Sequence, residues 1–150
     1  MDNVFYDGQV LWSQIDANMH LRHSAYSDFA AQARLNLLEQ LGLKPSAFSK
    51  YKLGPILFRE ETIYLREISL NEHIKVTCEM NKCRADGSRW SIRHEIYKAD
   101  GIKAAIINVD GAWIDMVQRK LTTLPDELNH LFLLTPRSHD FVEEIPKPKA

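Results

Sequence analysis

Four side chains with reactive polar groups gather within a short segment, residues 16–23. They supply one carboxylate, one carboxamide and two imidazoles, from Asp16, Asn18, His20 and His23. The short polar side chains of Asp16 and Asn18 can hydrogen-bond to their own backbone, which favours a turn. Ser24 follows, and as a preferred N-cap residue it predicts that a helix begins there. Because a helix N-terminus carries free N–H groups and partial positive charge, this arrangement suits a developing oxyanion.

These groups suit transfer of an acyl group to water, and hydrolysis of a thioester is one such reaction. It needs a carboxylate or an imidazole to activate water or to attack directly, and donors for the tetrahedral oxyanion. Asp16 can supply the first and the helix N-terminus the second. Asn18 can orient the carboxylate or the water, and His20 can accept a proton because imidazole titrates near neutral pH. Thiolate is a good leaving group, so the reaction requires no strong general acid, metal or redox cofactor.

Other interpretations of the same residues stay open. Asp16 can simply stabilise a turn, as aspartate often does. His20 and His23 have the spacing of a two-histidine metal pair, but zinc takes three or four ligands and no HExxH or CxxC motif accompanies them. We therefore expect no metal. Cys78 alternates with apolar residues, which indicates a buried small side chain rather than a nucleophile.

The composition is that of an ordinary globular protein of 150 residues, with 45% apolar and 26% charged residues. This length predicts one domain, residues 1–150, with a C-terminal tail over about 137–150. The net charge of −1 gives no global attraction to nucleic acid or to an anionic membrane. No apolar run approaches the roughly 20 residues that span a bilayer.

The setting that we expect is the reducing cytoplasm. The first ten residues lack the basic and apolar regions of a signal peptide. Two cysteines, Cys78 and Cys83, are too few and too close together for a disulfide framework.

The pattern of apolar residues predicts one long helix. A strand through Val10 and Trp12 comes before it, because apolar and polar residues alternate there. From Ser24 to about Leu41 apolar residues recur at helical spacing, and Gly42 is the expected C′ residue. Residues 43–54 are expected to form a loop or a short helical turn.

Beyond Pro55 the period becomes two, which predicts strands. They cover approximately residues 56–68, 74–81, 90–97 and 102–116, with tight turns at Asp86-Gly87 and Asp100-Gly101. A bulge or bend is expected at Asp110-Gly111. A short helix is predicted over residues 126–134. The result is an α+β layout of about five strands, whose sheet must cover the helix.

This order of elements resembles the hotdog-fold thioesterases, namely the 4-hydroxybenzoyl-CoA thioesterase-like and acyl-ACP thioesterase-like groups. The resemblance covers roughly residues 4–125. It rests on Asp16-Ala17-Asn18-Met19-His20 ahead of Ala25-Tyr26 and Ala33-Arg34. It implies a long central helix wrapped by a curved antiparallel sheet, in a homodimer or homotetramer whose active sites lie between subunits.

The resemblance also implies roles for individual residues. Asp16 falls where the first group keeps its catalytic aspartate, and Asp16, Asn18 and His20 match the Asp-x-Asn-x-His motif of the second. The thioester carbonyl of an acyl-CoA or acyl-ACP would lie against the helix start, with four residues in oxyanion or substrate contacts: Arg22, His23, Ser24 and Tyr26. The chain departs from many relatives at Met19, where they have glycine, and at Arg22 and His23, where they have asparagine.

Two alternatives to hydrolysis remain on the same fold. One is a hotdog protein that binds an acyl thioester or a protein partner without cleaving it. The other is a dehydratase that uses a histidine and an aspartate on a 3-hydroxyacyl or 2-enoyl chain. The Asp-x-Asn-x-His spacing favours hydrolysis. Arg22 is more easily explained as an ordinary solvated arginine than as a phosphate contact for CoA.

Overall fold

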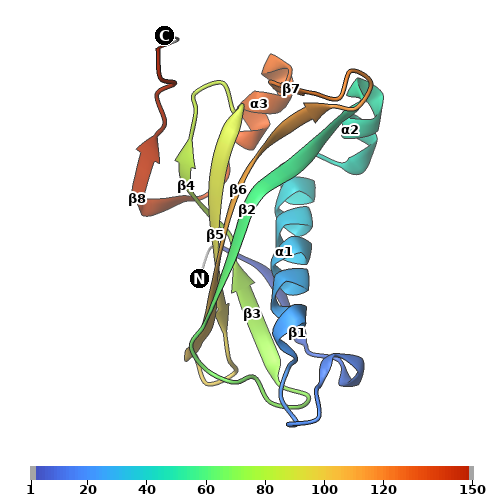
Figure 1. Cartoon of the computed structure of the whole chain (residues 1–150), viewed down its shortest axis with the longest axis vertical. Helices are drawn as coiled ribbons and strands as arrows, with labels where there is room; N and C mark the ends of the chain where they lie inside the picture. Colours follow the sequence, from blue (N-terminus) through green and yellow to red (C-terminus); the bar gives the residue numbers. More distant parts are fainter. Residues whose placement is uncertain (1–2, 149–150) are drawn as a thin grey trace. The chain divides into compact units, whose positions relative to one another are not determined.

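The structure is a computed structural model, which describes residues 3–148 (Figure 1). Its helices are α1 (Tyr26–Gln40), α2 (Pro45–Tyr51) and α3 (Asp126–Phe132), with two short 3-10 helices, η1 (Trp12–Gln14) and η2 (His23–Ala25). Its strands are β1 (Val4–Gln9), β2 (Leu53–Tyr64), β3 (His73–Thr77), β4 (Glu79–Cys83), β5 (Arg89–Tyr97), β6 (Lys103–Asp115), β7 (Lys120–Thr122) and β8 (Arg137–Glu143). The predicted α+β class is confirmed.

The strands form one eight-stranded sheet rather than the predicted five strands. Its order is β1-β3-β5-β4-β8, and β6 pairs with β5, β2 and β7. The pairs β1–β3, β3–β5 and β6–β7 are antiparallel, whereas β4–β8 is parallel. The sequence analysis did not predict β7, which has only three residues, or β8, whose residues are mostly exposed and polar.

The predicted strand over residues 74–81 is two strands, β3 and β4. The break lies at Cys78, whose N–H donates to the Asn3 carbonyl, in line with the pairing of β3 with β1. Met80 N–H donates instead to Pro136, at the beginning of the pairing with β8. A change of neighbouring strand leaves the alternation of side chains almost intact, so the sequence pattern did not reveal it.

The chain divides into two compact units, and β2, β5 and β6 contribute residues to both. The first takes in the chain up to Leu37, Glu61–Cys78 and Arg93–Asn108. The second takes in Leu38–Glu60, Glu79–Ile92 and the chain from Val109 onward. The single domain inferred from length stays a prediction.

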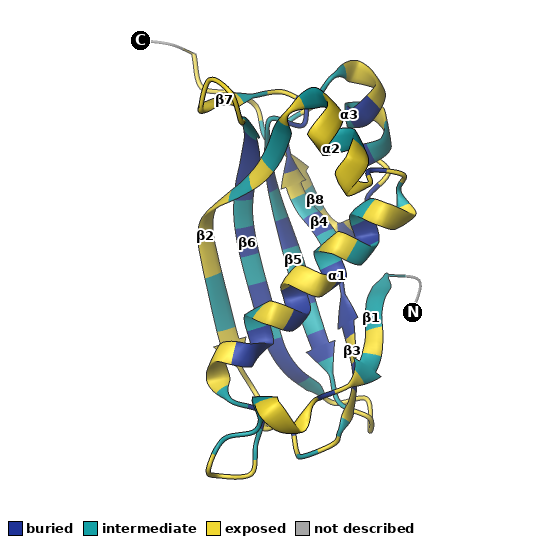
Figure 2. Cartoon of the chain, turned by 90° about the vertical axis from the view of Figure 1, so that its right-hand side faces the viewer, coloured by how far each residue is buried: buried dark blue, intermediate teal, exposed yellow. Residues whose placement is uncertain are grey.

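The core of the first unit forms where α1 packs on strands (Figure 2). The buried side chains of α1 are those of the predicted apolar stripe: Tyr26, Phe29, Ala30, Ala33 and Leu37. Phe29 packs against the ring of Tyr6 on β1 at 5.2 Å, and Asn36 Nδ2 donates to the Phe5 carbonyl at 2.6 Å. The predicted C′ residue, Gly42, has a φ of +91°, which confirms how the helix ends.

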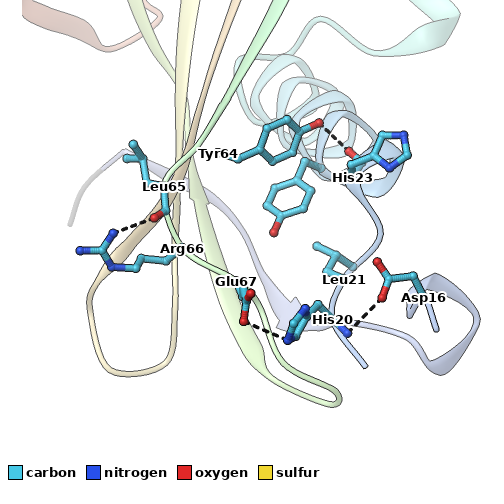
Figure 3. Close-up of a pocket in the computed structure, with 9 residues that line it drawn as sticks. Asp16, His20, Leu21, His23, Tyr64, Leu65, Arg66 and Glu67 are labelled. Carbon is cyan, nitrogen blue, oxygen red and sulfur yellow. Dashed lines mark hydrogen bonds and ion pairs between the residues drawn. The ribbon is translucent and has the colours of Figure 1, made fainter. Parts of the chain in front are cut away.

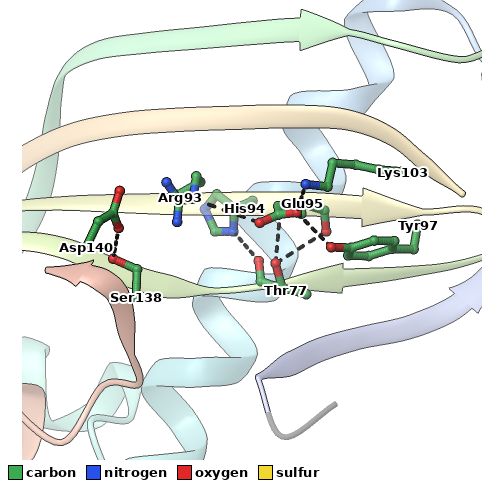
Figure 4. Close-up of polar contacts among 8 residues, drawn as sticks. All are labelled: Thr77, Arg93, His94, Glu95, Tyr97, Lys103, Ser138 and Asp140. Carbon is green, nitrogen blue, oxygen red and sulfur yellow. Dashed lines mark hydrogen bonds and ion pairs between the residues drawn. The ribbon is translucent and has the colours of Figure 1, made fainter. Parts of the chain in front are cut away.

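A cluster of buried polar residues lies inside this unit, around the fully buried imidazole of His94 (Figure 4). His94 Nδ1–H donates to the Thr77 carbonyl at 2.8 Å, so Nε2 accepts from Arg34 Nη1 at 2.9 Å. Burial, with the nearby charge of Arg34, lowers the pKa of His94 to about 3. His94 is therefore neutral in the native protein, as the Nδ1–H tautomer.

Both cysteines are buried thiols. Cys78 Sγ lies 3.3 Å from His94 Nδ1, a pairing that superficially resembles a nucleophilic dyad. Burial raises the pKa of the Cys78 thiol far above its usual range, and that of Cys83 to about 12. Because the thiolate is the nucleophile, the prediction that Cys78 is a buried small side chain is confirmed by its burial and its protonation.

Aromatic rings fill the core of the second unit. The ring of Trp113 lies 5.4 Å from Phe48, 6.0 Å from Trp90 and 5.2 Å from Phe132. Its Nε1–H donates to the Gly87 carbonyl at 2.9 Å, which satisfies the one polar atom of the indole. Gly87 has a φ of +72°, and this confirms the turn predicted at Asp86-Gly87.

Gly111 on β6 permits a close approach within this unit. A Cβ at this position would lie 2.4 Å from the Trp90 ring and 2.6 Å from the Ile56 carbonyl oxygen. We expect Gly111→Ala to lower the free energy of unfolding by about 1–3 kcal/mol, because neither the ring nor the backbone can yield easily. Urea denaturation of wild type and variant measures this difference in the free energy of unfolding.

Gly54→Ala is the matched control for that substitution. Its added Cβ would make one tight contact, with the flexible end of Met116 at 3.2 Å, so the loss of stability should be smaller. Equal losses in the two variants would contradict the steric explanation.

Three further sequence predictions need correction. Trp12 does not belong to a strand, since β1 ends at Gln9 and Trp12 opens η1 with 70% of its surface exposed. The strand predicted over residues 56–68 is β2, Leu53–Tyr64. The predicted tail is wrong for residues 137–143, which form β8, and its last two residues lie outside the described part.

Candidate active site

The predicted turn at Asp16 is present and is held by backbone hydrogen bonds. Asp16 N–H donates to the His20 carbonyl at 2.9 Å, and Met19 N–H donates to the Asp16 carbonyl at 3.0 Å. Asp16 Oδ1 accepts from the N–H groups of Asn18 at 2.9 Å and His20 at 3.4 Å. Met19 takes a φ of +66°, a conformation that glycine adopts more easily. The carboxylate is thus fixed by the loop that carries it.

The helical segment begins with η2, which leads directly into α1. The prediction that Ser24 is the N-cap is wrong: Arg22 has that position, with φ −64° and ψ 147°. The Ser24 hydroxyl accepts from Arg22 Nε at 3.1 Å instead of capping the helix. The N–H groups of His23 and Ser24 open the segment, where backbone donors have no intrahelical acceptor. Two donors are therefore placed at the helix start.

A pocket of about 320 Å³ lies beside this helix start (Figure 3). Its lining comes from the Asp16 loop, the beginning of α1 and the end of β2 with the residues after it: Asp16, His20, Leu21, His23, Tyr26, Tyr64, Leu65, Arg66 and Glu67. Arg66 Nη1 donates to the Leu65 carbonyl at 2.7 Å, and Figure 3 shows its guanidinium turned away from His20. The pocket joins apolar walls with several polar groups, as ligand sites do.

The side chains of His20 and Glu67 meet in the pocket. His20 Nε2 lies 2.9 Å from Glu67 Oε2, and Figure 3 shows His20 between Glu67 on one side and Asp16 on the other. The sequence analysis did not single out Glu67. It lies 47 residues beyond His20 in the printed numbering, so only the folded chain brings the two together. The sequence offered one signal for Glu67, namely that polar residues follow the first strand after the long helix.

Two tyrosines form one wall of the pocket. The rings of Tyr26 and Tyr64 lie 5.0 Å apart, nearly perpendicular at 84°. Tyr64 O–H donates to the His23 carbonyl at 2.8 Å. Burial raises the pKa of Tyr26, opposed by a backbone hydrogen bond with Ile68; Tyr64, Glu67 and Asp16 add to the rise. Tyr26 therefore keeps its hydroxyl proton in this setting.

The structure brings together four of the seven predicted site residues: Asp16, His20, His23 and Tyr26 line the pocket. Asn18, Arg22 and Ser24 do not. The side chain of Asn18 is exposed, and its contact with Asp16 is made by its backbone N–H. Arg22 stabilises the segment before the Asp16 loop, since its Nη1 donates to the Ser13 carbonyl at 2.8 Å.

Residues 3–148 contain no group of three or more His, Cys, Asp or Glu side chains arranged to hold a metal ion. In the same range, none of the helices has the length and apolar character that crossing a bilayer requires.

Solved structures with the same fold include a Staphylococcus aureus protein in complex with CoA (TM-score 0.82, 19% identity, 97% of this chain and 96% of that one). A DHNA-CoA thioesterase from Staphylococcus aureus has a TM-score of 0.79 at 17% identity, covering 86% of this chain and 87% of that one. A 1,4-dihydroxy-2-naphthoyl-CoA thioesterase from Synechocystis has a TM-score of 0.76 at 16% identity, covering 87% and 96%. These similarities confirm the predicted hotdog fold.

Among curated proteins, no sequence matches this chain. The model of the thioesterase-like superfamily matches residues 10–132, a span that includes the Asp16 loop, α1 and Glu67. This match supports a thioester hydrolase. The chain belongs to the thioesterase-like superfamily.

Proposed function

We propose that this protein hydrolyses an acyl-CoA thioester in the pocket beside Asp16. One observation carries the proposal: the Asp16 carboxylate lines the pocket and is fixed by two backbone N–H groups beside the start of the helix. The carboxylate can act as base or nucleophile, and the N–H of His23 at the helix start can hold the oxyanion; together they meet both requirements of acyl transfer to water. The superfamily match supports this assignment.

The proposed reaction begins at the carboxylate. The two N–H groups hold Asp16 Oδ1, so Oδ2 acts on water as a base or attacks the acyl carbon as a nucleophile. A new C–O bond forms, and the carbonyl oxygen becomes an oxyanion beside the N–H group of His23, which lines the pocket at the helix start. Collapse of this intermediate breaks the C–S bond, and CoA leaves as the thiolate. If water attacks, the acid is released at once; if Asp16 attacks, the acyl group stays on Asp16 as a mixed anhydride, which a water molecule then hydrolyses to the acid and the free carboxylate.

We assign the movement of protons to the His20–Glu67 pair. A carboxylate bonded to one imidazole nitrogen stabilises the imidazolium that forms when the other nitrogen takes a proton. Glu67 lies on the opposite side of His20 from Asp16, so it can support His20 without occupying the place of the substrate carbonyl. His20 can then deliver the proton that it has taken from water to the departing thiolate.

CoA is the carrier that we favour over acyl carrier protein. One structure with this fold was solved in complex with CoA, and two others are a DHNA-CoA thioesterase and a 1,4-dihydroxy-2-naphthoyl-CoA thioesterase. Release of free thiol from a panel of acyl-CoA and aryl-CoA esters tests the proposal, and we expect turnover of at least one of them. Thiol release from none of them, with the ligands still bound, would favour the non-hydrolytic alternative. Absorbance of a conjugated enoyl thioester would detect the dehydratase.

We further propose that two copies of the chain associate through β2. Among the described strands β2 pairs only with β6, so one of its edges lacks a partner. That strand also exposes 40–51% of four large apolar or aromatic side chains: Leu57, Phe58, Ile63 and Tyr64. Light scattering should find a dimer or a larger assembly, and a stable monomer would contradict this proposal.

Removing the acid–base pair should slow turnover. We expect His20→Ala to lower kcat by about tenfold to a hundredfold, and Glu67→Gln by about tenfold, because general acid–base assistance is typically worth this much. Since the residues act together, the double variant should lose little more than His20→Ala alone. Losses that multiply would show that the two act independently. An unchanged pH–rate profile in His20→Ala would argue against a proton role.

A further inference from the structure

Glu67 reaches His20 as a diagonal neighbour across a short backbone pairing. An antiparallel bridge places Ser69 opposite His20, and Glu67 comes two residues before Ser69. Diagonal neighbours across antiparallel segments are within reach of long side chains only. The 2.9 Å contact between Glu67 Oε2 and His20 Nε2 therefore depends on the register of this bridge (Figure 3). A shift of one residue would turn the Glu67 side chain to the other face.

Side-chain packing does little to hold this contact. Glu67 keeps 71% of its side-chain surface exposed, and His20 keeps 35%. Contacts between exposed side chains are weak, because holding both in one geometry costs side-chain entropy. A group that moves protons in a reaction must nevertheless be held to within about 0.5 Å of its productive position. The backbone from which Glu67 projects must therefore be fixed.

One residue, Glu72, bonds both backbone groups of Ser69. The pairing with the Asp16 loop uses the neighbours of Ser69 instead, since Leu21 N–H donates to the Ile68 carbonyl at 2.8 Å. Ser69 N–H donates to Glu72 Oε1 at 3.1 Å, and the Ser69 carbonyl accepts from Glu72 N–H at 3.1 Å. Glu72 thus holds Ser69 at two points while leaving its pairing with His20 intact.

Glu72 is also anchored on two other segments of the same unit. Its second carboxylate oxygen, Oε2, accepts from the N–H of Ala99, between β5 and β6, at 3.2 Å. Its carbonyl accepts from the N–H of Val10, just beyond β1, at 3.0 Å, and Val10 is buried. Each carboxylate oxygen therefore serves a different segment, and the side chain links the backbone that carries Glu67 to the turn at Ala99.

We propose that Glu72 is a positioning residue for the acid–base pair of His20 and Glu67. Its carboxylate fixes Ser69 opposite His20, and this register keeps Glu67 Oε2 against the imidazole while His20 takes up a proton and delivers it. The inference rests on the proposed function. It adds a residue that does not line the pocket and acts only through the backbone.

Glu72→Gln tests the inference, because glutamine keeps the shape of the side chain but has one accepting oxygen. Whichever way the amide turns, either Ser69 or Ala99 loses its acceptor. We expect kcat to fall about threefold to fivefold and KM to stay within about twofold, since the pair acts on the reaction and not on substrate binding. The fall is smaller than that expected for Glu67→Gln because the pair is loosened and not removed.

Combining Glu72→Gln with Glu67→Gln separates positioning from a general loss of stability. If Glu72 acts through Glu67, adding Glu72→Gln to the Glu67→Gln protein should lower kcat by less than about twofold, since effects on coupled residues do not multiply. A merely structural residue would lower kcat by the same factor in both backgrounds.

Asp115→Asn is the matched control. The Asp115 carboxylate also accepts from two backbone N–H groups of a turn, those of Val117 and Gln118, and it does not line the pocket. This variant loses a turn carboxylate of the same kind, so its kcat should equal that of wild type.

Nitrogen NMR of the His20 ring tests the geometry without any substrate. The chemical shift of Nε2 should move in Glu72→Gln toward its value in Glu67→Gln, and it should stay at the wild-type value in Asp115→Asn. A wild-type Nε2 shift in Glu72→Gln would overturn the inference, as would wild-type kcat or equal factors in the two backgrounds. None of these results affects the proposed function. Absence of thiol release by the wild-type protein would overturn the proposed function, and the Nε2 shift would still decide whether Glu72 positions Glu67.

Discussion

Replacement of Asp16 by asparagine should reduce turnover at least about a hundredfold. The substitution keeps the size of the side chain and the oxygen that accepts from Asn18 and His20, so the loop should keep its conformation. It removes the charge, and with it the capacity to act as base or nucleophile. Steady-state thiol release measures kcat, and circular dichroism checks the fold.

Asp28→Asn is the matched control. Asp28 is a second aspartate near the helix start, in the first turn of α1, but it is exposed and does not line the pocket. Its replacement should leave kcat near the wild-type value. If Asp16→Asn retains most of its turnover, the base lies elsewhere, and Glu67, across His20 in the same pocket, becomes the first residue to test.

Stability should decrease steeply in mild acid because of His94. Its pKa is about 3 in the native protein and about 6.5 in an unfolded chain. Below pH 6.5 the His94 imidazole binds a proton in the unfolded chain but not in the native protein, so acid favours unfolding. The contribution is fully present above this pH and is lost as the pH falls toward 3. The free energy of unfolding should fall by about 1.4 kcal/mol per pH unit within that window.

Urea denaturation at about pH 7.5 and about pH 5 measures this effect, which should amount to about 2 kcal/mol for this one residue. His94→Gln keeps an acceptor for Arg34 and cannot titrate, so its stability should depend less on pH by that amount. His139→Gln, on the exposed side of β8, should leave the pH dependence unchanged. Equal pH dependence in wild type and His94→Gln would contradict the assignment.

Local patterns predicted most of the elements well. The apolar stripe of α1 and its end at Gly42 follow from spacing and backbone conformation within a few residues. The turns at Gly87 and Gly101, with φ of +72° and +86°, follow from the same kind of local chemistry. The break at Cys78 did not, because it depends on which strand lies alongside, a property of distant residues.

The candidate site shows the same division. Asp16, His20 and His23 lie within one short segment, and their residue types and spacing, together with the family resemblance, identified them. Ser24 was wrongly predicted as the cap because the helical segment begins one residue earlier, at His23, with Arg22 as its N-cap. Glu67 and Tyr64 reach the pocket from β2 and the residues after it, and no local pattern links them to the Asp16 loop. Tertiary pairing therefore supplied the partners of the residues that the sequence named.

The deep burial of both thiols has a practical consequence for measuring this enzyme. Disulfide reagents that report free CoA by colour react with thiolates. With the pKa of Cys78 raised far above its usual range and that of Cys83 raised to about 12, the native chain presents almost none at neutral pH. A colour signal from folded protein therefore reports product alone, and a slow background that grows in urea would report the two cysteines as the chain opens.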